Sequence, residues 1–313
     1  MPELPEVEVV RLSLEPRLLG RRFTAVDVRS PALREPLDAG ALGSLAGATV
    51  HRLRRRGKYL LIDCIAKEDC VAQEDGDPTE DCATEDGDPT EDGQRSLVVH
   101  LGMSGQLTVV PSTTPVAKHE HVAWHLEAQH LEAQHREARG TGERLRLVDP
   151  RRFGQAFVLP TAAIDTDRHF EHLGIEPLGT ELDGEYLRRR AMGRRGPIKN
   201  FLMDGRVVVG VGNIYACEVL WRCRVHPRRS VHRIGVDTWQ RLADQVRAVL
   251  GDAIAEGGTT LNDFLDGEGN SGYFQVSLDA YGRDGKPCRR CGRNLRRIVQ
   301  AGRGTFYCPG CQR

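Results

Sequence analysis

The sequence predicts an α+β protein in which a β-rich first part, a helical second part and a metal-binding hairpin follow one another along 313 residues. Three observations support this order. Short apolar runs of the strand type fill the first half, helical patterns follow Pro160, and four closely spaced cysteines lie near the end. Because a chain of this length typically forms more than one domain, we expect units at residues 1–160, 161–275 and 276–313.

The first expected element is a helix that begins within the opening stretch MPELPEVEVV. Prolines such as Pro5 are tolerated in a first helical turn, and carboxylates there face the positive end of the helix dipole. A second interpretation is chemical, because loss of Met1 would leave Pro2 with a secondary amine that can attack an electrophilic carbon. The stretch alone leaves both interpretations open. The apolar side chains of residues 5–20 that we expect on one helical face are Val7, Val10, Leu14 and Leu18.

Strands are expected to fill the rest of the first unit, because short apolar runs recur there at close spacing. This pattern favours an antiparallel sandwich or barrel. The strand runs lie at residues 22–30, 48–56, 58–65, 96–103, 105–110, 143–149 and 154–159. Helices are expected after them, at residues 181–192, 212–223 and 237–256.

Two repetitive segments interrupt the strand pattern. Residues 67–93 repeat EDGDPTED and hold twelve acids and one lysine with almost no large apolar side chains, so we expect them to be disordered. The formal net charge is zero, yet the rest of the chain holds 43 basic and 32 acidic residues, a balance that suits a nucleic-acid partner. Residues 125–139 read HLEAQ, HLEAQ, HREAR and predict a polar surface insertion, with His130 and His135 in solvent rather than on a metal.

Composition argues against a membrane or secreted protein. No apolar run approaches the roughly 20 residues of a membrane span, and the beginning of the chain lacks the basic-then-apolar layout of a signal peptide. We therefore expect a cytoplasmic protein whose nine cysteines are mostly reduced thiols or metal ligands.

The C-terminal stretch CRRCGRNLRRIVQAGRGTFYCPGC is typical of a zinc site. Two C-x2-C pairs stand sixteen residues apart, a spacing that suits tetrahedral Zn²⁺ closing a β-hairpin. Four thiolates leave no open position for water, so one structural ion is expected; four ordinary cysteines are the alternative. Nine basic residues against one acid at 283–313 favour phosphate binding, although zinc ribbons also serve protein contacts. The expected ligands are Cys288, Cys291, Cys308 and Cys311.

Six stretches in a fixed order together resemble the formamidopyrimidine-DNA glycosylase family. They are PELPEVE, HLGMSG (100–105), DPRRFG (149–154), GVGNIYA (210–216), GGTTLNDF (257–264) and the four-cysteine hairpin. Their order and their spread from residue 2 to residue 311 extend the resemblance to essentially the whole chain apart from the two repeats, which the family pattern lacks. The resemblance implies a monomeric bacterial-type repair enzyme that excises oxidised purines, 8-oxoguanine and formamidopyrimidines, from damaged double-stranded DNA and cleaves the strand by β,δ-elimination. It also implies an N-terminal β-sandwich, a helical domain with a helix–two-turn–helix element and a C-terminal zinc-finger β-hairpin.

The resemblance assigns the catalytic roles to four residues. Pro2 would form a Schiff base with C1′ of the damaged nucleoside, and Glu3 would shuttle protons, with Glu6 as an orienting group. Lys58, which follows a glycine between two strands, matches a lysine that contacts the lesion and supports elimination; a solvated basic hairpin is the alternative. Arg303 matches an arginine that lies against phosphate and assists the second elimination. The basic stretch 51–60 is expected to supply a cationic field that opposes protonation of the amine.

Further matches concern the DNA. Met103, Arg151 and Phe153 resemble the set that fills the space of an extruded nucleotide and pairs with the orphan cytosine, although Met103 and Phe153 also fit an ordinary strand core. The glycine-rich loop at 257–275 resembles a segment that closes over the extruded base. The residues that match phosphate-contacting positions are His119, Arg194 (a lysine in the family), Lys199 and Asn213.

Two alternatives remain open from the sequence. The sister group that excises oxidised pyrimidines typically carries glycine where this chain has Leu4, and it lacks the same set of space-filling residues. A zinc-dependent DNA-binding protein without catalysis would need only the helical domain and the finger. That alternative leaves Pro2, Glu3 and Lys58 without an explanation.

Overall fold

The computed structural model of the chain describes four stretches, residues 2–66, 93–128, 142–258 and 278–313. Three predicted segments lie largely outside these described residues. They are the acidic repeat at 67–93, the polar repeat at 125–139 and the glycine-rich loop at 257–275. In the described stretches, no helix combines the length and the apolar character needed to cross a lipid bilayer.

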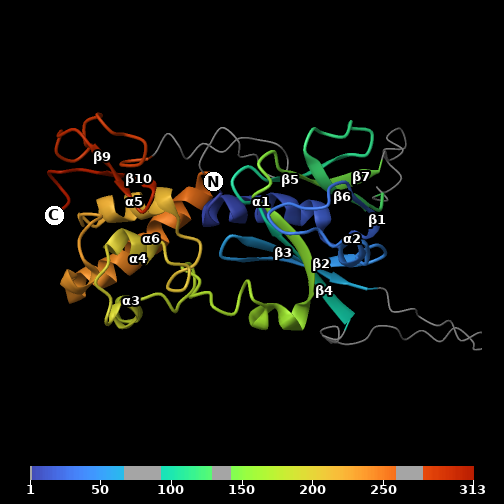
Figure 1. The fold of residues 1–313 in the computed structure, drawn as a ribbon, viewed down its shortest axis with the longest axis horizontal. Helices are drawn as coiled ribbons and strands as arrows, with labels where there is room; N and C mark the ends of the chain where they lie inside the picture. The colour runs from blue at the N-terminus through green and yellow to red at the C-terminus, as the bar shows by residue number, and fades with distance from the viewer. Residues whose placement is uncertain (1, 67–92, 129–141, 259–277) are drawn as a thin grey trace, which may run out of the picture.

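Helix α1 (Leu4–Leu18) lies between the two halves of the chain (Figure 1). Its four predicted apolar side chains are at most 1% exposed and pack into the core of the first half, as the amphipathic pattern indicated. Leu4 points the other way and belongs to the core of the helical half, whereas Val7, one turn later, belongs to the core of the first half. A single helix is therefore anchored in both cores.

Eight strands in the described stretches form two four-stranded antiparallel sheets, in the orders β2-β3-β4-β8 and β1-β6-β7-β5. Side chains of both sheets, such as Leu60 and Trp124, meet in one apolar core. The sandwich expectation is therefore confirmed. The strands are β1 (Phe23–Val28), β2 (Thr49–Arg56), β3 (Tyr59–Ile65), β4 (Gln94–His100), β5 (Gln106–Pro111), β6 (Glu120–Leu126), β7 (Glu143–Val148) and β8 (Gln155–Pro160), with the short helix α2 (Ala39–Gly43) after β1.

Strand β6 corrects the expectation for the polar repeat at 125–139. His125 and Leu126 belong to that repeat in sequence, yet they pair with β1 and β7. The strand escaped prediction because its first residues, Glu120 and His121, are polar but only 5% and 1% exposed. They are hydrogen-bonded inside the protein, so the stretch lacks the alternation by which strands are recognised.

The second half is helical, as expected after Pro160. The long helix α6 places apolar side chains three and four residues apart and packs them against α3 and α5. Helix α4 was not expected, because it is only one turn long and follows Pro197. The helices are α3 (Gly184–Ala191), α4 (Ile198–Leu202), α5 (Asn213–Arg222) and α6 (Val236–Ala255), with 3₁₀ turns η2 (Thr161–Thr166) and η3 (Val231–Arg233).

The C-terminal hairpin consists of β9 (Arg296–Gln300) and β10 (Arg303–Tyr307) and lies beside α5 (Figure 1). The two strands stand between the cysteine pairs, as the zinc-hairpin prediction requires. A glycine with φ of +70°, Gly302, follows the left-handed Ala301 in the turn that leads to Arg303. The hairpin therefore presents the beginning of β10 next to the N-terminus of α5.

Candidate active site

The loop before α5 wraps closely around the beginning of the chain. The Leu4 amide donates to the carbonyl oxygen of Gly210 at 3.2 Å, and the Ile214 amide donates to the Glu3 carboxylate at 3.0 Å. A Cβ atom on Gly212 would lie 2.2 Å from the Glu3 carboxyl carbon, and one on Gly210 would lie 2.5 Å from the Leu4 side chain. The glycines of the GVGN motif are thus required by the close approach of Glu3 to the helix N-terminus.

Glu3 is a buried carboxyl group, only 2% exposed, at the N-terminus of α5. Burial raises its pKa and the charge of Glu6 adds to the rise, whereas the charge of Lys58 and amide hydrogen bonds from α5 oppose it. Its Oε2 atom has no hydrogen-bond partner among the described residues. Capping of α5 occupies one oxygen, so the other remains available for proton transfer.

Glu6 connects the first turn of α1 to α5. One of its oxygens accepts the Glu3 amide at 2.7 Å, and the other accepts the Tyr215 hydroxyl at 2.5 Å. Glu6 is 0% exposed, and Pro2, which directly precedes Glu3, is also buried. These bonds fix the backbone next to Pro2, which fits the orienting role expected of Glu6.

Two positively charged residues, Lys58 and Arg303, come from the β2–β3 turn and from β10. Lys58 follows Gly57 in the turn between β2 and β3, and Arg303 begins β10. Burial lowers the pKa of the Lys58 ammonium, and the nearby Arg303 charge lowers it further, whereas Glu3 and Glu6 oppose this shift. Of the four catalytic residues expected from the sequence, Glu3 and Arg303 therefore both lie close enough to Lys58 to act on its charge.

The arginines of the stretch 51–60 are arranged differently from the expectation. Arg54 pairs with Asp63 at 2.5 Å, and both Arg55 and Arg56 pair with Glu176, at 2.7 and 3.3 Å. Because carboxylates compensate these guanidinium charges, Lys58 is the residue of the stretch whose positive charge acts on Glu3.

Lys199 and Asn213 form one hydrogen-bonded unit with the hairpin. The Lys199 ammonium donates to the side-chain oxygen of Asn213 and, at 2.7 Å, to the Thr305 hydroxyl. The Asn213 amide donates in turn to the carbonyl oxygen of Gly304 at 3.0 Å. Lys199 is only 1% exposed, so the structure places it behind Asn213 rather than on the surface. The unit fastens β10 to the first residue of α5.

The motifs HLGMSG and DPRRFG are held together by Asp149, which is 0% exposed. One of its oxygens accepts the Ser104 hydroxyl at 2.6 Å, and the other accepts the Gly154 amide at 2.7 Å. The backbones of the two loops touch, because a Cβ on Gly102 would lie 2.3 Å from the carbonyl carbon of Phe153. Sequence reasoning did not single out Asp149, since its role depends on contacts between distant loops.

The proposed space-filling residues lie together on these loops. Strand β4 ends at His100, so Met103 stands in a turn and is only half-buried, and Phe153 is 45% exposed. The Arg151 guanidinium lies 5.0 Å from the centre of the Phe153 ring. The strand-core alternative for Met103 and Phe153 is therefore wrong.

The other two candidates for DNA contact lie elsewhere. His119 is exposed, adopts a positive φ of 66°, and its carbonyl oxygen accepts the Asp149 amide at 3.0 Å. Arg194 pairs with Asp204 at 2.8 Å and lies 5.5 Å from the centre of the Phe201 ring, within the helical half. Among the residues that the structure describes, neither side chain bonds to Glu3, Lys58 or Arg303.

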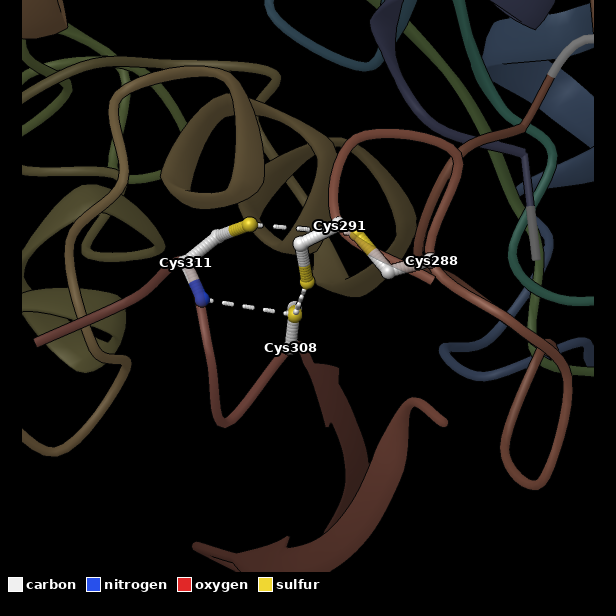
Figure 2. Close-up of side chains that lie close together, drawn as sticks. All are labelled: Cys288, Cys291, Cys308 and Cys311. Carbon is white, nitrogen blue, oxygen red and sulfur yellow. Dashed lines mark hydrogen bonds between the residues drawn. The ribbon is translucent and has the colours of Figure 1, made fainter. Parts of the chain in front are cut away.

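The four cysteines of the hairpin gather their sulfur atoms around one point (Figure 2). All four sulfurs lie within 4.8 Å of one another, with 3.9 Å between Cys288 and Cys311 and 3.4 Å between Cys291 and Cys308. Tetrahedral Zn²⁺ with Zn–S bonds of about 2.3 Å requires sulfurs about 3.8 Å apart. The residues therefore fit one structural zinc ion. Three further described cysteines are buried free thiols, namely Cys64, Cys217 and Cys223.

Three family models match the chain. "Formamidopyrimidine-DNA glycosylase N-terminal domain" matches residues 1–156, "Formamidopyrimidine-DNA glycosylase H2TH domain" matches 173–264, and "Zinc finger found in FPG and IleRS" matches 285–313. The second and third models agree with the helical half and with the zinc hairpin.

Relatives of known name match over their whole length. The formamidopyrimidine-DNA glycosylases of Magnetococcus marinus and Acidithiobacillus ferrooxidans are 41% and 43% identical, with 100% of each chain covered. Two solved structures of the Lactococcus lactis Fpg (MutM) protein, one with DNA containing N7-benzyl-Fapy-dG and one with DNA containing an oxidised pyrimidine, match with a TM-score of 0.79 at 28% identity over 99% of each chain. On its motifs, fold and relatives, this chain belongs to the formamidopyrimidine-DNA glycosylase family.

Proposed function

We propose that this chain excises oxidised purines, 8-oxoguanine and formamidopyrimidines, from duplex DNA and then cleaves the strand at the abasic site by β,δ-elimination. The observation that carries the proposal is the convergence of three separate elements on Lys58, whose pKa is lowered by burial and by the charge of Arg303 and raised by the charge of the buried Glu3. Membership of the formamidopyrimidine-DNA glycosylase family supports the same activity.

The first step uses the amine of Pro2 after removal of the initiator methionine. The amine attacks C1′ of the damaged nucleoside as the bond to the base breaks, and the departing base takes up a proton. An α-amine has a pKa of about 8 and reacts only when neutral, a form that the positive charges of Lys58 and Arg303 favour. Glu3, whose pKa is raised by burial, is placed to carry the protons of this step.

The second step cleaves the strand. The Schiff base makes the C2′ proton acidic, its loss breaks the bond to the 3′ phosphate, and a second elimination breaks the bond to the 5′ phosphate. We assign Lys58, whose pKa is lowered by burial, to contact with the lesion and to assistance in proton transfer. Arg303 lies against a phosphate, whose departure its charge assists.

Excision requires the nucleotide to leave the base stack, which costs a few kcal/mol. We assign Met103 and Phe153 to the vacated space and Arg151 to the orphan cytosine, because the loops that carry them touch and the Arg151 guanidinium lies beside the Phe153 ring. Asn213 contacts a phosphate at the N-terminus of α5, with Lys199 behind it as a source of positive charge. His119 and Arg194 contact phosphates farther along the strands.

The rest of the proposal concerns the molecule as a whole. Residues 1–160 form the catalytic unit, residues 161–275 the helical DNA-binding unit and residues 276–313 the zinc finger. The protein acts as a monomer in the cytoplasm, where the bacterial chromosome lies. The single zinc ion is structural, since four cysteines complete its coordination.

Borohydride trapping tests the proposed function directly, because it reduces a Schiff base to a stable amine. Protein lacking Met1 should become covalently linked to a duplex with 8-oxoguanine opposite cytosine, and protein that retains Met1 should not. A Pro2→Gly variant is no control, because glycine still offers an N-terminal amine. Absence of cleavage by processed, zinc-loaded protein would instead support a DNA-binding protein without catalysis.

Oxidised pyrimidines are a second candidate substrate class. A specific observation favours testing it, namely that the Lactococcus lactis protein is known in a complex with DNA containing an oxidised pyrimidine. The same trapping assay with thymine glycol separates the two classes. Equal or better trapping on thymine glycol would move the assignment toward the pyrimidine group.

A further inference from the structure

The turn that carries Lys58 is held through the backbone of the residue before it. The Gly57 amide donates to one oxygen of Glu176 at 2.6 Å, and the Gly57 carbonyl oxygen accepts from the Arg55 guanidinium at 3.1 Å. The same guanidinium nitrogen pairs with the other oxygen of Glu176 at 2.7 Å. Both polar groups of Gly57, which adopts a positive φ of 58°, are thus fixed by one ion pair.

This ion pair connects three separate elements. Arg55 is on β2 and is only 8% exposed, and its Nε atom also pairs with Glu8 of α1 at 2.9 Å. Glu176 lies in the segment that joins the sandwich to α3. The Arg55 charge is therefore enclosed by one carboxylate from the helix that begins beside Glu3 and one from the segment between the two halves.

The same segment runs beside the loop that holds Glu3. The Ile175 amide donates to the Val207 carbonyl oxygen at 3.3 Å, and the Val209 amide donates to the Ile175 carbonyl oxygen at 3.1 Å. A Cβ on Gly57 would lie 3.1 Å from Val209, so the Lys58 turn rests on this loop. Three residues after Val209 the chain reaches the glycine that closes on the Glu3 carboxylate.

We propose that Arg55 and Glu176 are positioning residues that hold Lys58 in register with Glu3. They touch no substrate; they act by fixing the peptide next to Lys58 against the loop that fixes Glu3. The inference rests on the proposed function, since it assigns a purpose to the placement of Lys58. It differs from a general stabilising role because the partners of the ion pair are the backbone atoms of the turn itself.

Single-turnover kinetics test the inference. Arg55→Met should lower the rate of 8-oxoguanine excision by about 10- to 100-fold, because a displacement of about 1 Å in a reacting group has a cost of this order. Its affinity for a duplex with an abasic-site analogue should stay within about threefold of wild type. Glu176→Gln, which keeps an acceptor for the Gly57 amide but loses the charge, should fall between Arg55→Met and wild type.

Arg54→Met is the matched control, because Arg54 lies on the same strand and also pairs with a carboxylate, yet it does not bond to the Lys58 turn. It should excise at the wild-type rate. Thermal unfolding of each variant shows whether it is folded at the assay temperature. A rate for Arg55→Met equal to that of Arg54→Met would overturn the inference.

A double variant separates positioning from a merely structural effect. If Arg55 acts only through Lys58, Arg55→Met should slow excision no further in a Lys58→Ala background. Losses that multiply would show that Arg55 acts independently of Lys58 and would also overturn the inference. If the wild-type protein shows no excision activity, the proposed function itself is wrong. If the wild type excises and Arg55→Met excises at the same rate, only the positioning role is refuted.

Discussion

The guanidinium carbon of Arg290 lies 3.8 Å from the centre of the Trp221 ring. Arg290 stands between the first two zinc ligands and also donates to the Trp221 carbonyl oxygen at 2.7 Å, near the end of α5. At the beginning of the same helix, Asn213 donates to Gly304 of the zinc hairpin. The zinc finger therefore contacts both ends of α5. Binding or loss of the zinc ion is expected to affect the position of this helix, whose N-terminus binds the Glu3 carboxylate.

Loss of the metal is expected to impair DNA binding. Cys308→Ser should abolish zinc binding, and because hairpins of this kind fold with their metal, Arg303 would no longer be held in place. Native mass spectrometry should find one zinc ion in the wild type and none in the variant. Cys223→Ser, which changes a buried cysteine that is not part of the cluster, should bind zinc and DNA normally. Equal DNA affinity and salt dependence of the zinc-free protein would contradict the role of the finger.

Replacement of Glu3 by glutamine should remove the proton shuttle while keeping an oxygen that accepts the Ile214 amide. We expect excision of 8-oxoguanine to slow by about 10²- to 10⁴-fold, the usual effect of losing a general acid or base. Single-turnover assays measure this rate. Glu15→Gln, on the same helix but paired with Arg11 on its partly exposed face, is the control and should excise normally.

The same substitution should change the pH dependence of stability. The pKa of Glu3 is raised in the folded protein, so the group favours folding at acid pH, and this contribution is lost as pH rises through the folded-state pKa. Glu3→Gln should therefore unfold at a higher temperature than wild type near pH 8, with the difference shrinking toward about pH 4. Thermal unfolding across this range provides the measurement. A difference that grew toward acid pH would mean that the pKa of Glu3 is lowered.

Arg151 should determine the preference for cytosine opposite the lesion. A good contact between a side chain and a base edge discriminates by about 1–3 kcal/mol. Arg151→Ala should therefore bring the excision rates opposite cytosine and adenine closer together by about 5- to 150-fold, as measured in paired duplexes. Arg168→Ala removes an arginine whose side chain is 73% exposed and pairs with Glu35, and it should preserve the preference. If Arg151→Ala left the preference for cytosine over adenine unchanged, Arg151 would not recognise the base opposite the lesion.

Deletion of residues 67–93 should strengthen binding to undamaged DNA without loss of excision. The segment carries twelve acids, whose charges compete with phosphate for the basic surface. Ile65 and Gln94 pair across the flanking strands, so a short turn can replace the segment without disturbing the hairpin. Titration of undamaged duplex at several salt concentrations should show the gain mainly at low salt. Identical affinities at every salt would reject the competition, and lost excision would mean that the segment takes part in the fold.

The sequence predicted those parts of the fold that repeat a simple pattern. The apolar face of α1, most of the strands and the four-cysteine hairpin all show a spacing that physical chemistry dictates locally. Sequence reasoning failed at β6, because Glu120 and His121 are polar yet buried, and the His121 ring bonds to the Asp149 carbonyl oxygen of a loop 28 residues away.

The candidate site divides in the same way. Residues of short motifs, such as Glu3 and Arg303, could be named from the sequence because their neighbours are characteristic. Asp149 and Glu176 could not, because each accepts a hydrogen bond from a partner far away in the chain. The Asp149 carboxylate accepts the Ser104 hydroxyl, the Glu176 carboxylate accepts the Gly57 amide, and a lone acid in a sequence does not reveal such partners. Lys199 was expected to contact phosphate, and only the fold shows that it lies behind Asn213.

The attachment of α1 to both cores has a mechanical consequence. Leu4 and Val7 are one helical turn apart, yet each is embedded in a different half of the molecule. If the sandwich and the helical half rotate relative to each other when a duplex binds, the apolar contacts of Leu4 and Val7 are both preserved only when the hinge lies at this helical turn. Points on a pivot move least, so Glu3 and Glu6 would keep their geometry while the outer loops travel.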